Sequence, residues 1–320
     1  MKQAWTDLEN RQQILDFIDY WQKESNLPRR QLLAWLDIAS STYHDWCKRA
    51  NQKNRHNGIV PKAHWLLPWE RSEILDFAYK NPEEGYRRLT YLLIDANVVA
   101  ASPSSVYRVL KEAGVLDRWN GQSSNKGTGF QQPSGPHEHW HTDVAYLNIC
   151  GTFYYLCSII DGYSRYVVHW EIREQMKEVD VEIILQRALE ANPGVTPRLI
   201  TDNGPQFVSK DLKIYLREKG LKHVRTSPYY PQSNGKIERW HKSLKSECIR
   251  KKTPLSLEDA RQVVTHYVAH YNHERLHSAI GYISPADKLA GKEAAIFAAR
   301  RLKLAQARER RCREYQAKAS

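Results

Sequence analysis

The sequence predicts a mixed α/β fold in which helices flank a five-stranded sheet, preceded by all-α helix-turn-helix domains. Apolar residues follow helical spacing through about the first 119 positions, and strand-like segments begin at Trp140. Between them, residues 120–136 are rich in Gly, Ser, Asn and Pro and have no hydrophobic period, which is typical of a linker. A run of strands followed by alternating helix and strand indicates a sheet covered by helices.

At 320 residues the chain has room for two or three small domains. We expect an N-terminal helix-turn-helix at 1–60, a second at 61–119, the linker at 120–136, the α/β domain at 137–291 and a basic helical tail at 292–320. The tail holds nine Lys or Arg against three Glu. Such a tail is typical of a solvated helix and could also contact phosphate groups.

The composition favours a cytosolic protein with a polyanionic partner. Hydrophobic residues make up 41% of the chain, and no apolar run approaches the roughly 18 residues of a membrane span. The N-terminus lacks the apolar segment of a secretory signal. A net charge of +12 makes nucleic acid the commonest kind of partner. Five scattered cysteines without a Cys-x-x-Cys pair argue against disulfides and structural zinc, so we interpret them as reduced packing residues, with Cys150 and Cys157 facing the core.

Two helix-break-helix patterns predict the helix-turn-helix domains. In the first, a segment at 28–36 precedes a three-residue break and a helix that begins with Ser40 as its cap. In the second, a helix at 85–93 precedes one with Ser102 at the N-cap, Pro103 at N1 and Gly114 as the stop. Helical hairpins without DNA contacts are common, but two in tandem on a basic chain favour DNA binding.

The α/β domain is predicted element by element. We expect strands at 140–149, 152–160, 166–172, 198–201 and 221–225. We expect helices at about 179–191, 206–219 and 234–249, and a further helix opened by Ser256 and Asp259.

Three acidic residues occupy positions that such a sheet would bring together. Asp143 lies midway along the first strand, and Asp202 ends the fourth strand before a sharp turn. Glu238 flanks the apolar stripe of the later helix, at the edge that faces the sheet. Carboxylates without Cys or a His set favour Mg²⁺ or Mn²⁺, and a pair of such ions can activate an attacking oxygen and stabilise the leaving one. The alternating His137, His139 and His141 could imitate a metal site, but packing or phosphate contact is the preferred interpretation.

The strings around these acids resemble the core of the retroviral-integrase-like transposases. They are Trp-His-Thr-Asp at 140–143, Thr-Asp-Asn-Gly-Pro-Gln-Phe at 201–207 and the segment from Ser227 to Trp240, with 35 residues between Asp202 and Glu238. The segment at 271–286, which begins Tyr-Asn-His-Glu-Arg-Leu-His, resembles the end of the catalytic domain in OrfB-type transposases of bacterial insertion sequences. The Gly-Tyr-Arg-Arg string at 85–88 resembles their upstream helix-turn-helix. The zinc-binding His-His-Cys-Cys domain of retroviral integrases is not found.

This resemblance implies an RNase H-like fold and a transposase that cleaves and joins DNA, with Asp143, Asp202 and Glu238 as catalytic and metal-binding residues. The expected partners are DNA, a second copy of the chain and, by family analogy, an upstream-frame transposase subunit, and the expected location is the cytoplasmic nucleoid. The candidate DNA-contacting side chains are Lys245, Lys242, Arg239, Asn203, Arg108, Tyr107, Ser104, Arg87 and Arg88. Lys245 lies seven residues after Glu238, two helical turns along the same face. The alternatives are an RNase H-like nuclease without joining activity and a non-catalytic DNA-binding repressor or domesticated transposase.

Overall fold

The structure is a computed structural model that describes residues 6, 8–50, 65–116, 132–226 and 234–319. The chain divides into two compact units, Met1–Lys62 and Ala63–Ser320. Because residues 1–5, 51–64 and 117–131 lie outside the described ranges, most of the predicted linker and the ends of both predicted helix-turn-helix domains are not described. Among the described helices, none combines the length and apolar character needed to cross a membrane.

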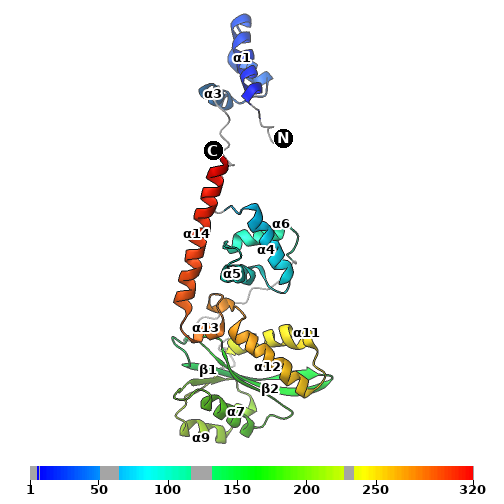
Figure 1. The fold of residues 1–320 in the computed structure, drawn as a ribbon, viewed down its shortest axis with the longest axis vertical. Helices are drawn as coiled ribbons and strands as arrows, with labels where there is room; N and C mark the ends of the chain where they lie inside the picture. Colours follow the sequence, from blue (N-terminus) through cyan, green and yellow to red (C-terminus); the bar gives the residue numbers. More distant parts are fainter. Residues whose placement is uncertain (1–5, 7, 51–64, 117–131, 227–233, 320) are drawn as a thin grey trace. The chain divides into compact units, whose positions relative to one another are not determined.

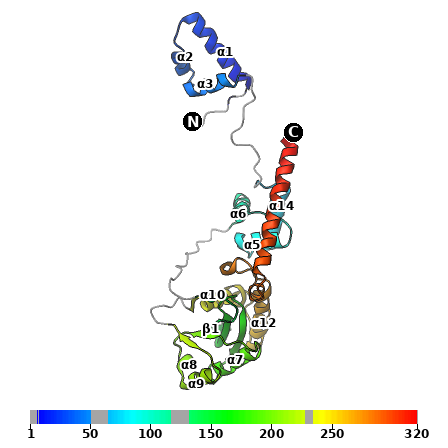
Figure 2. The same cartoon turned by 90° about the vertical axis from the view of Figure 1, so that its left-hand side faces the viewer.

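The first unit consists of three short helices around a small core. They are α1 (Leu8–Ser25), α2 (Arg29–Trp35) and α3 (Ser40–Lys48), which Figure 2 shows packed together. Their buried apolar side chains are Leu15, Ile18, Leu32, Leu33 and Tyr43. The predicted Ser cap of α3 is wrong by one residue. Ala39 occupies the N-cap and has no side-chain hydrogen bond to offer, whereas Ser40 is already helical.

Three further helices begin the second unit. They are α4 (Pro68–Lys80), α5 (Tyr86–Asp95) and α6 (Pro103–Glu112). The cap predicted for α6 is confirmed, because the Ser102 hydroxyl accepts a hydrogen bond from the Ser105 amide and Pro103 stands at N1. Gly114 follows the helix with a φ of 69°, a left-handed conformation that glycine adopts without a Cβ penalty. Helix α4 was not predicted individually.

The α/β domain is built on one mixed five-stranded sheet in the order β3-β2-β1-β4-β5. The strands are β1 (His139–Ile149), β2 (Thr152–Asp161), β3 (Val167–Arg173), β4 (Arg198–Thr201) and β5 (His223–Arg225). β1 pairs antiparallel with β2 and parallel with β4, which itself runs parallel to β5. This is the RNase H-like arrangement that the sequence predicts.

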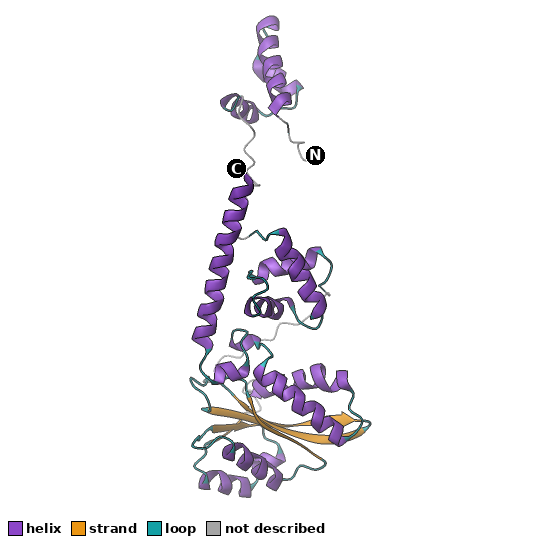
Figure 3. Ribbon diagram, viewed as in Figure 1, coloured by secondary structure: helices purple, strands orange, loops and turns teal. Residues whose placement is uncertain are grey.

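Helices cover both faces of the sheet (Figures 1 and 3). On one face, α7 (Glu178–Glu190), α8 (Pro205–Val208) and α9 (Lys210–Glu218) pack over a core centred on Trp140 and Phe207. The single helix predicted at 206–219 is wrong, since Ser209 separates α8 from α9 and caps the second by accepting a hydrogen bond from the Leu212 amide.

The opposite face carries the helices that follow the fifth strand. They are α10 (Gly235–Ser243), the π-helical turn η2 (Leu244–Ile249), α11 (Arg250–Lys252) and α12 (Leu257–His273). A continuous α-helix from 234 to 249 was predicted, so the π-helical turn is a correction. The Ser256 cap of α12 is confirmed, because its hydroxyl accepts from the Asp259 amide. Cys157 lies in the core as expected, but Cys150 is exposed at the β1–β2 turn, with a φ of 48°.

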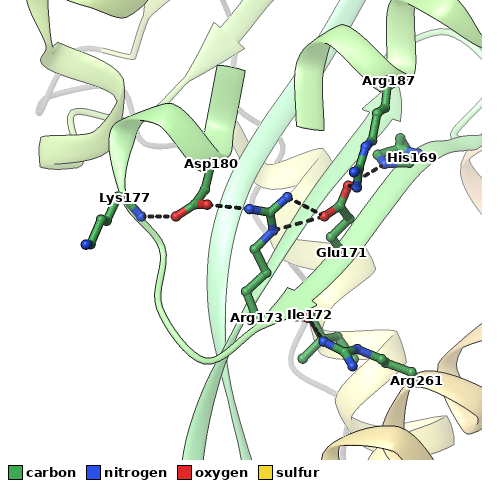
Figure 4. A network of polar contacts seen from close by, with 8 residues as sticks. All are labelled: His169, Glu171, Ile172, Arg173, Lys177, Asp180, Arg187 and Arg261. Carbon is green, nitrogen blue, oxygen red and sulfur yellow. Dashed lines mark hydrogen bonds and ion pairs between the residues drawn. The ribbon is translucent and has the colours of Figure 1, made fainter. Parts of the chain in front are cut away.

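A polar network ties the sheet edge to both helical layers (Figure 4). Arg173 of β3 donates to Glu171 and also pairs with Asp180 near the start of α7. From the other face, the Arg261 guanidinium of α12 donates to the Ile172 carbonyl at 3.1 Å. Because β3 is an edge strand, these contacts fix it against α7 and α12 at once.

The chain continues into a long terminal helix. After η3 (Ser278–Ile280) and α13 (Pro285–Leu289), α14 runs from Glu293 to Ala319. Figure 1 shows it alongside α4–α6. A solvated helix was the simplest expectation for this basic segment. Instead, one face of α14 packs against the second unit's helices, with Arg300, Ala307 and Arg311 buried.

Candidate active site

The first two predicted acids belong to neighbouring parallel strands, Asp143 within β1 and Asp202 directly after β4. Asp143 is half-buried on β1, where its Oδ1 accepts a hydrogen bond from the Val144 amide at 2.8 Å. Asp202 follows β4, and its Oδ1 accepts from the Gly204 amide at 2.9 Å. A Cβ at Gly204 would lie 3.0 Å from that oxygen and 2.7 Å from Gln206 Nε2, so the turn beside Asp202 is tightly packed.

The charges of the two aspartates interact. Burial raises the pKa of the Asp202 carboxyl, and the negative charge of Asp143 raises it further, against the lowering effect of the Gly204 hydrogen bond. A cation near the Asp202 carboxylate would favour its charged form and offset the effects of burial and of the Asp143 charge. The pair therefore has the electrostatic character of a site for a positively charged ligand.

Glu238 approaches Asp143 from the helical layer. Helix α10 packs on the sheet through Ile237 and Trp240, which are fully buried, and this leaves Glu238 exposed on the adjoining face. Asp143 and Glu238 line the same cavity, of about 480 Å³. Its lining also includes nitrogen-bearing side chains, namely His241, Lys242, Lys245 and Arg250, together with Val144, Ala145, Tyr146 and Ser246.

Oxygen donors are the right chemistry for a hard divalent cation. However, among the residues that the structure describes, no three His, Cys, Asp or Glu side chains are grouped closely enough to hold a metal ion. In the structure, Asp143 and Glu238 line one cavity. The charge of Asp143 also acts on the Asp202 carboxyl. The three carboxylates do not form a coordination shell in this arrangement.

Two lining residues were missed by sequence reasoning. The imidazole Nδ1 of His241 lies 3.5 Å from Asp143 Oδ2, and His241 is one helical turn after Glu238. Its spacing of three residues was the available signal. Arg250 reaches the cavity from beyond the π-helical turn, a position that α-helical spacing could not have indicated.

The candidate DNA contacts differ in accessibility. Lys242 and Lys245 line the cavity, while Arg239 is exposed outside it. Asn203 is exposed, and its amide donates to the Thr226 carbonyl at 2.7 Å. The remaining candidates lie on α5 and α6.

On α6, Ser104, Tyr107 and Arg108 are exposed at helical spacing and so share one face. Arg87 is also exposed and lies over the Tyr86 ring. Arg88 is less available, because it is half-buried and paired with Glu84 at 2.7 Å.

The three alternating histidines are packing residues. His139 and His141 are buried at the β1 end of the sheet, and burial lowers the pKa of both imidazoles, so they are neutral near pH 7. His137 Nδ1 accepts a hydrogen bond from the Trp140 indole at 3.1 Å.

The α/β domain is similar in sequence to known proteins. Residues 133–231 and 219–285 match two family models, each described as an integrase core domain. An uncharacterised 39.2 kDa protein of insertion element IS476 from Xanthomonas euvesicatoria is 26% identical over 220 residues, covering 67% of this chain and 63% of the relative. The transposase InsF of insertion sequence IS3A from Escherichia coli K12 is 33% identical over 156 residues, covering 48% of this chain and 54% of the relative.

Solved structures also match this chain, at low identity. The HTLV-2 integrase catalytic core domain in complex with magnesium is 18% identical, with a TM-score of 0.39, and the match covers 48% of this chain and 97% of that one. The matched segments span less than two thirds of the IS476 and InsF proteins. On the family models and these relatives, the chain carries an integrase core domain and is related to the transposases of bacterial insertion elements.

Proposed function

We propose that this chain is a transposase that cleaves DNA at the ends of a mobile element and joins the freed end to a second site. The observation that carries the proposal is the shared cavity of Asp143 and Glu238, lined by Lys242, Lys245 and Arg250, with Asp202 electrostatically coupled to Asp143. Two carboxylates beside basic side chains are suited to bind both a cation and a phosphodiester.

The residues that would hold divalent cations are Asp143, Asp202 and Glu238, and we propose Mg²⁺ or Mn²⁺, with a pair of ions in the assembled site. When bound, such ions supply Lewis-acid activation of an attacking oxygen and of the phosphate. The chain's own groups do the positioning. Lys242 and Lys245 bind phosphate oxygens, and the rigid β1 and β4 strands orient the aspartates.

DNA contact extends beyond the cavity. The exposed face of α6 with Ser104, Tyr107 and Arg108 is suited to base edges or phosphates, and the net charge of +12 adds attraction that does not depend on sequence. Because two element ends must be handled together, we propose at least a dimer. The upstream-frame subunit and the nucleoid location stay predictions.

The test is strand transfer by an Asp202→Asn variant, with Asp211→Asn on exposed α9 as the matched control. With Mg²⁺ and a DNA end that carries a 3′-hydroxyl, we expect the wild-type chain and the control to form joined product. The Asp202→Asn variant should lose it by at least about 10²-fold, while it still binds DNA.

The two alternative functions predict different results in this assay. Cleavage by the wild-type chain without any joined product would favour the RNase H-like nuclease. If the wild-type chain and both variants bind DNA equally well and none of them cleaves it, the result would favour the non-catalytic DNA-binding protein. Full joining activity in Asp202→Asn would refute the assignment of this residue.

A further inference from the structure

Helix α14 joins the second helix-turn-helix to the integrase core through a continuous row of side chains. The row consists of Arg300, Lys303, Ala307, Arg311 and Tyr315, at spacings of three or four residues along one face. We propose that α14 is a strut that holds α6 at a fixed place relative to the cavity of Asp143 and Glu238. The strut then determines how far from the recognised sequence the DNA is cut, an inference that rests on the proposed transposase function.

The base of the strut is anchored in the integrase core. Gly281 has a φ of 81°, and a Cβ there would lie 2.5 Å from the ring of Phe297 on α14, so the turn and the helix are in close contact. The Arg300 guanidinium donates to the carbonyls of Gly281 and Tyr282, the latter at 2.7 Å. The motif at 271–286, which the active site does not use directly, therefore serves as the seat of α14.

The same arginine reaches into the helix-turn-helix. Arg300 forms two hydrogen bonds with the Asp95 carboxylate at the end of α5, at 2.8 and 2.5 Å. Its guanidinium lies 4.8 Å from the centre of the Tyr91 ring, which in turn stacks on Tyr282 at 4.7 Å. Since Arg300 is only 5% exposed, one buried side chain connects α14, α5 and the core. A two-pronged guanidinium–carboxylate contact fixes direction as well as distance.

Further contacts follow toward the C-terminal end of α14. The Lys303 ammonium donates to the Ile94 carbonyl at 2.9 Å, at the carboxyl end of α5 where a cation is favoured. Arg311 forms two hydrogen bonds with Glu70 of α4 and donates to the Ala100 carbonyl at 2.6 Å. Tyr315 donates its hydroxyl hydrogen to the Leu66 carbonyl. From Arg300 to Tyr315 the row spans about 22 Å at 1.5 Å per residue.

These contacts leave the DNA-facing side of the helix-turn-helix accessible. They go to α4, to the end of α5 and to Ala100, whereas Ser104, Tyr107 and Arg108 of α6 stay exposed. A DNA duplex bound by α6 would thus keep one distance and one rotation relative to the cavity. One base pair of displacement moves a phosphate by about 3.4 Å and turns it by roughly 35°. A misplacement of about 1 Å can already cost about 10²-fold in rate.

The first experiment measures spacing tolerance in the full-length chain. Element-end DNA is made with the recognised sequence moved by one or two base pairs in either direction, and the cleavage sites are mapped by sequencing. We expect the wild type to favour its native spacing by at least about 10²-fold. Arg300→Ala should lower that preference by at least tenfold, and Arg300→Lys should lower it less. The exposed neighbour Arg301 supplies the control Arg301→Ala, which should behave as the wild type.

The second measurement does not require activity. Spin labels at the exposed Lys111 on α6 and the exposed Asn148 on β1, in a background without the exposed cysteines, report the distance between the two domains. We expect one narrow distance distribution in the wild type and a broad one in Arg300→Ala, with unchanged helix content by circular dichroism. A broad distribution in the wild type, or an unchanged one in Arg300→Ala, would overturn the strut. A narrow wild-type distribution without DNA cleavage would support the strut and reject the transposase proposal.

Discussion

The buried ion pair between Glu70 and Arg311 allows a sharp test of how α14 is held. Glu70 is completely buried and the Arg311 side chain is 3% exposed. Removing one partner leaves a buried charge without compensation, which costs about 3–5 kcal/mol. The Glu70 carboxylate also accepts from Arg310, which is 44% exposed. Arg311→Met therefore leaves Glu70 with one cation, whereas Glu70→Met leaves Arg311 with the Ala100 carbonyl alone.

We expect Glu70→Met to fall near the upper end of that range and Arg311→Met near the lower end. The double variant Glu70→Met/Arg311→Met should be more stable than either single variant, because an apolar pair removes both buried charges. Arg71→Ala is the matched surface control. It breaks the exposed pair with Glu112 and should cost no more than about 1 kcal/mol.

Native-state hydrogen exchange of the amides of α4 is the suitable assay, since a chain of several domains does not unfold in one step. The single variants should accelerate opening by roughly 10²- to 10⁴-fold. If the single variants cost less than about 1 kcal/mol, or if the cost of the double variant equals the sum of the single costs, the Glu70–Arg311 pair is not a coupled buried ion pair.

Two further predictions concern the segment that seats α14. Gly281→Ala should destabilise the Ala63–Ser320 unit by at least about 1 kcal/mol, because it places a Cβ at a φ of 81° and 2.5 Å from Phe297. The control is Gly291→Ala, because the space around a Cβ at that position is open. A thermal melt of Gly281→Ala that equals the melt of the control would contradict this prediction. Burial by itself would raise the pKa of the Glu247 carboxyl, but the hydrogen bonds and charge of Arg275, with the Tyr267 hydroxyl, outweigh it and lower the pKa. Since the folded pKa is the lower one, this stabilisation is complete above the unfolded pKa of about 4.3 and is lost as the pH falls through the folded value. Urea denaturation followed against pH should show a smaller acid loss in Glu247→Gln than in the wild type.

The sheet could be predicted because its signals are local. β4 was predicted at its observed bounds, since Leu199 and Ile200 form a short apolar run that ends at Asp202. The expectation of an RNase H-like mixed five-stranded sheet came from the resemblance of the acidic strings rather than from any single strand. The split between α8 and α9 escaped prediction because Ser209 can either continue a helix or cap one, and here it caps α9 by accepting a hydrogen bond from the Leu212 amide.

The features that escaped prediction depend on distant partners. In the π-helical turn, Glu247 accepts two hydrogen bonds from Arg275, which is 28 residues away. The pattern of residues around Glu247 could not predict this contact, because helical spacing reports only neighbours three or four residues apart. The basic run of α14 looked like a solvated helix because Asp95 and Glu70 lie 205 and 241 residues from their arginines. The candidate site was easier, since Asp143, Asp202 and Glu238 each stand in a distinctive string.

We propose that Asp143, Asp202 and Glu238 bind divalent cations directly. It is tested most directly by an Asp143→Cys variant assayed for strand transfer in Mg²⁺ and then in Mn²⁺, because a thiolate is a poor ligand for Mg²⁺ and a better one for Mn²⁺. We expect Asp143→Cys to lose joining activity in Mg²⁺ and to recover part of it in Mn²⁺, with DNA binding unchanged in both. Joining by Asp143→Cys in Mg²⁺ at the wild-type rate would contradict it.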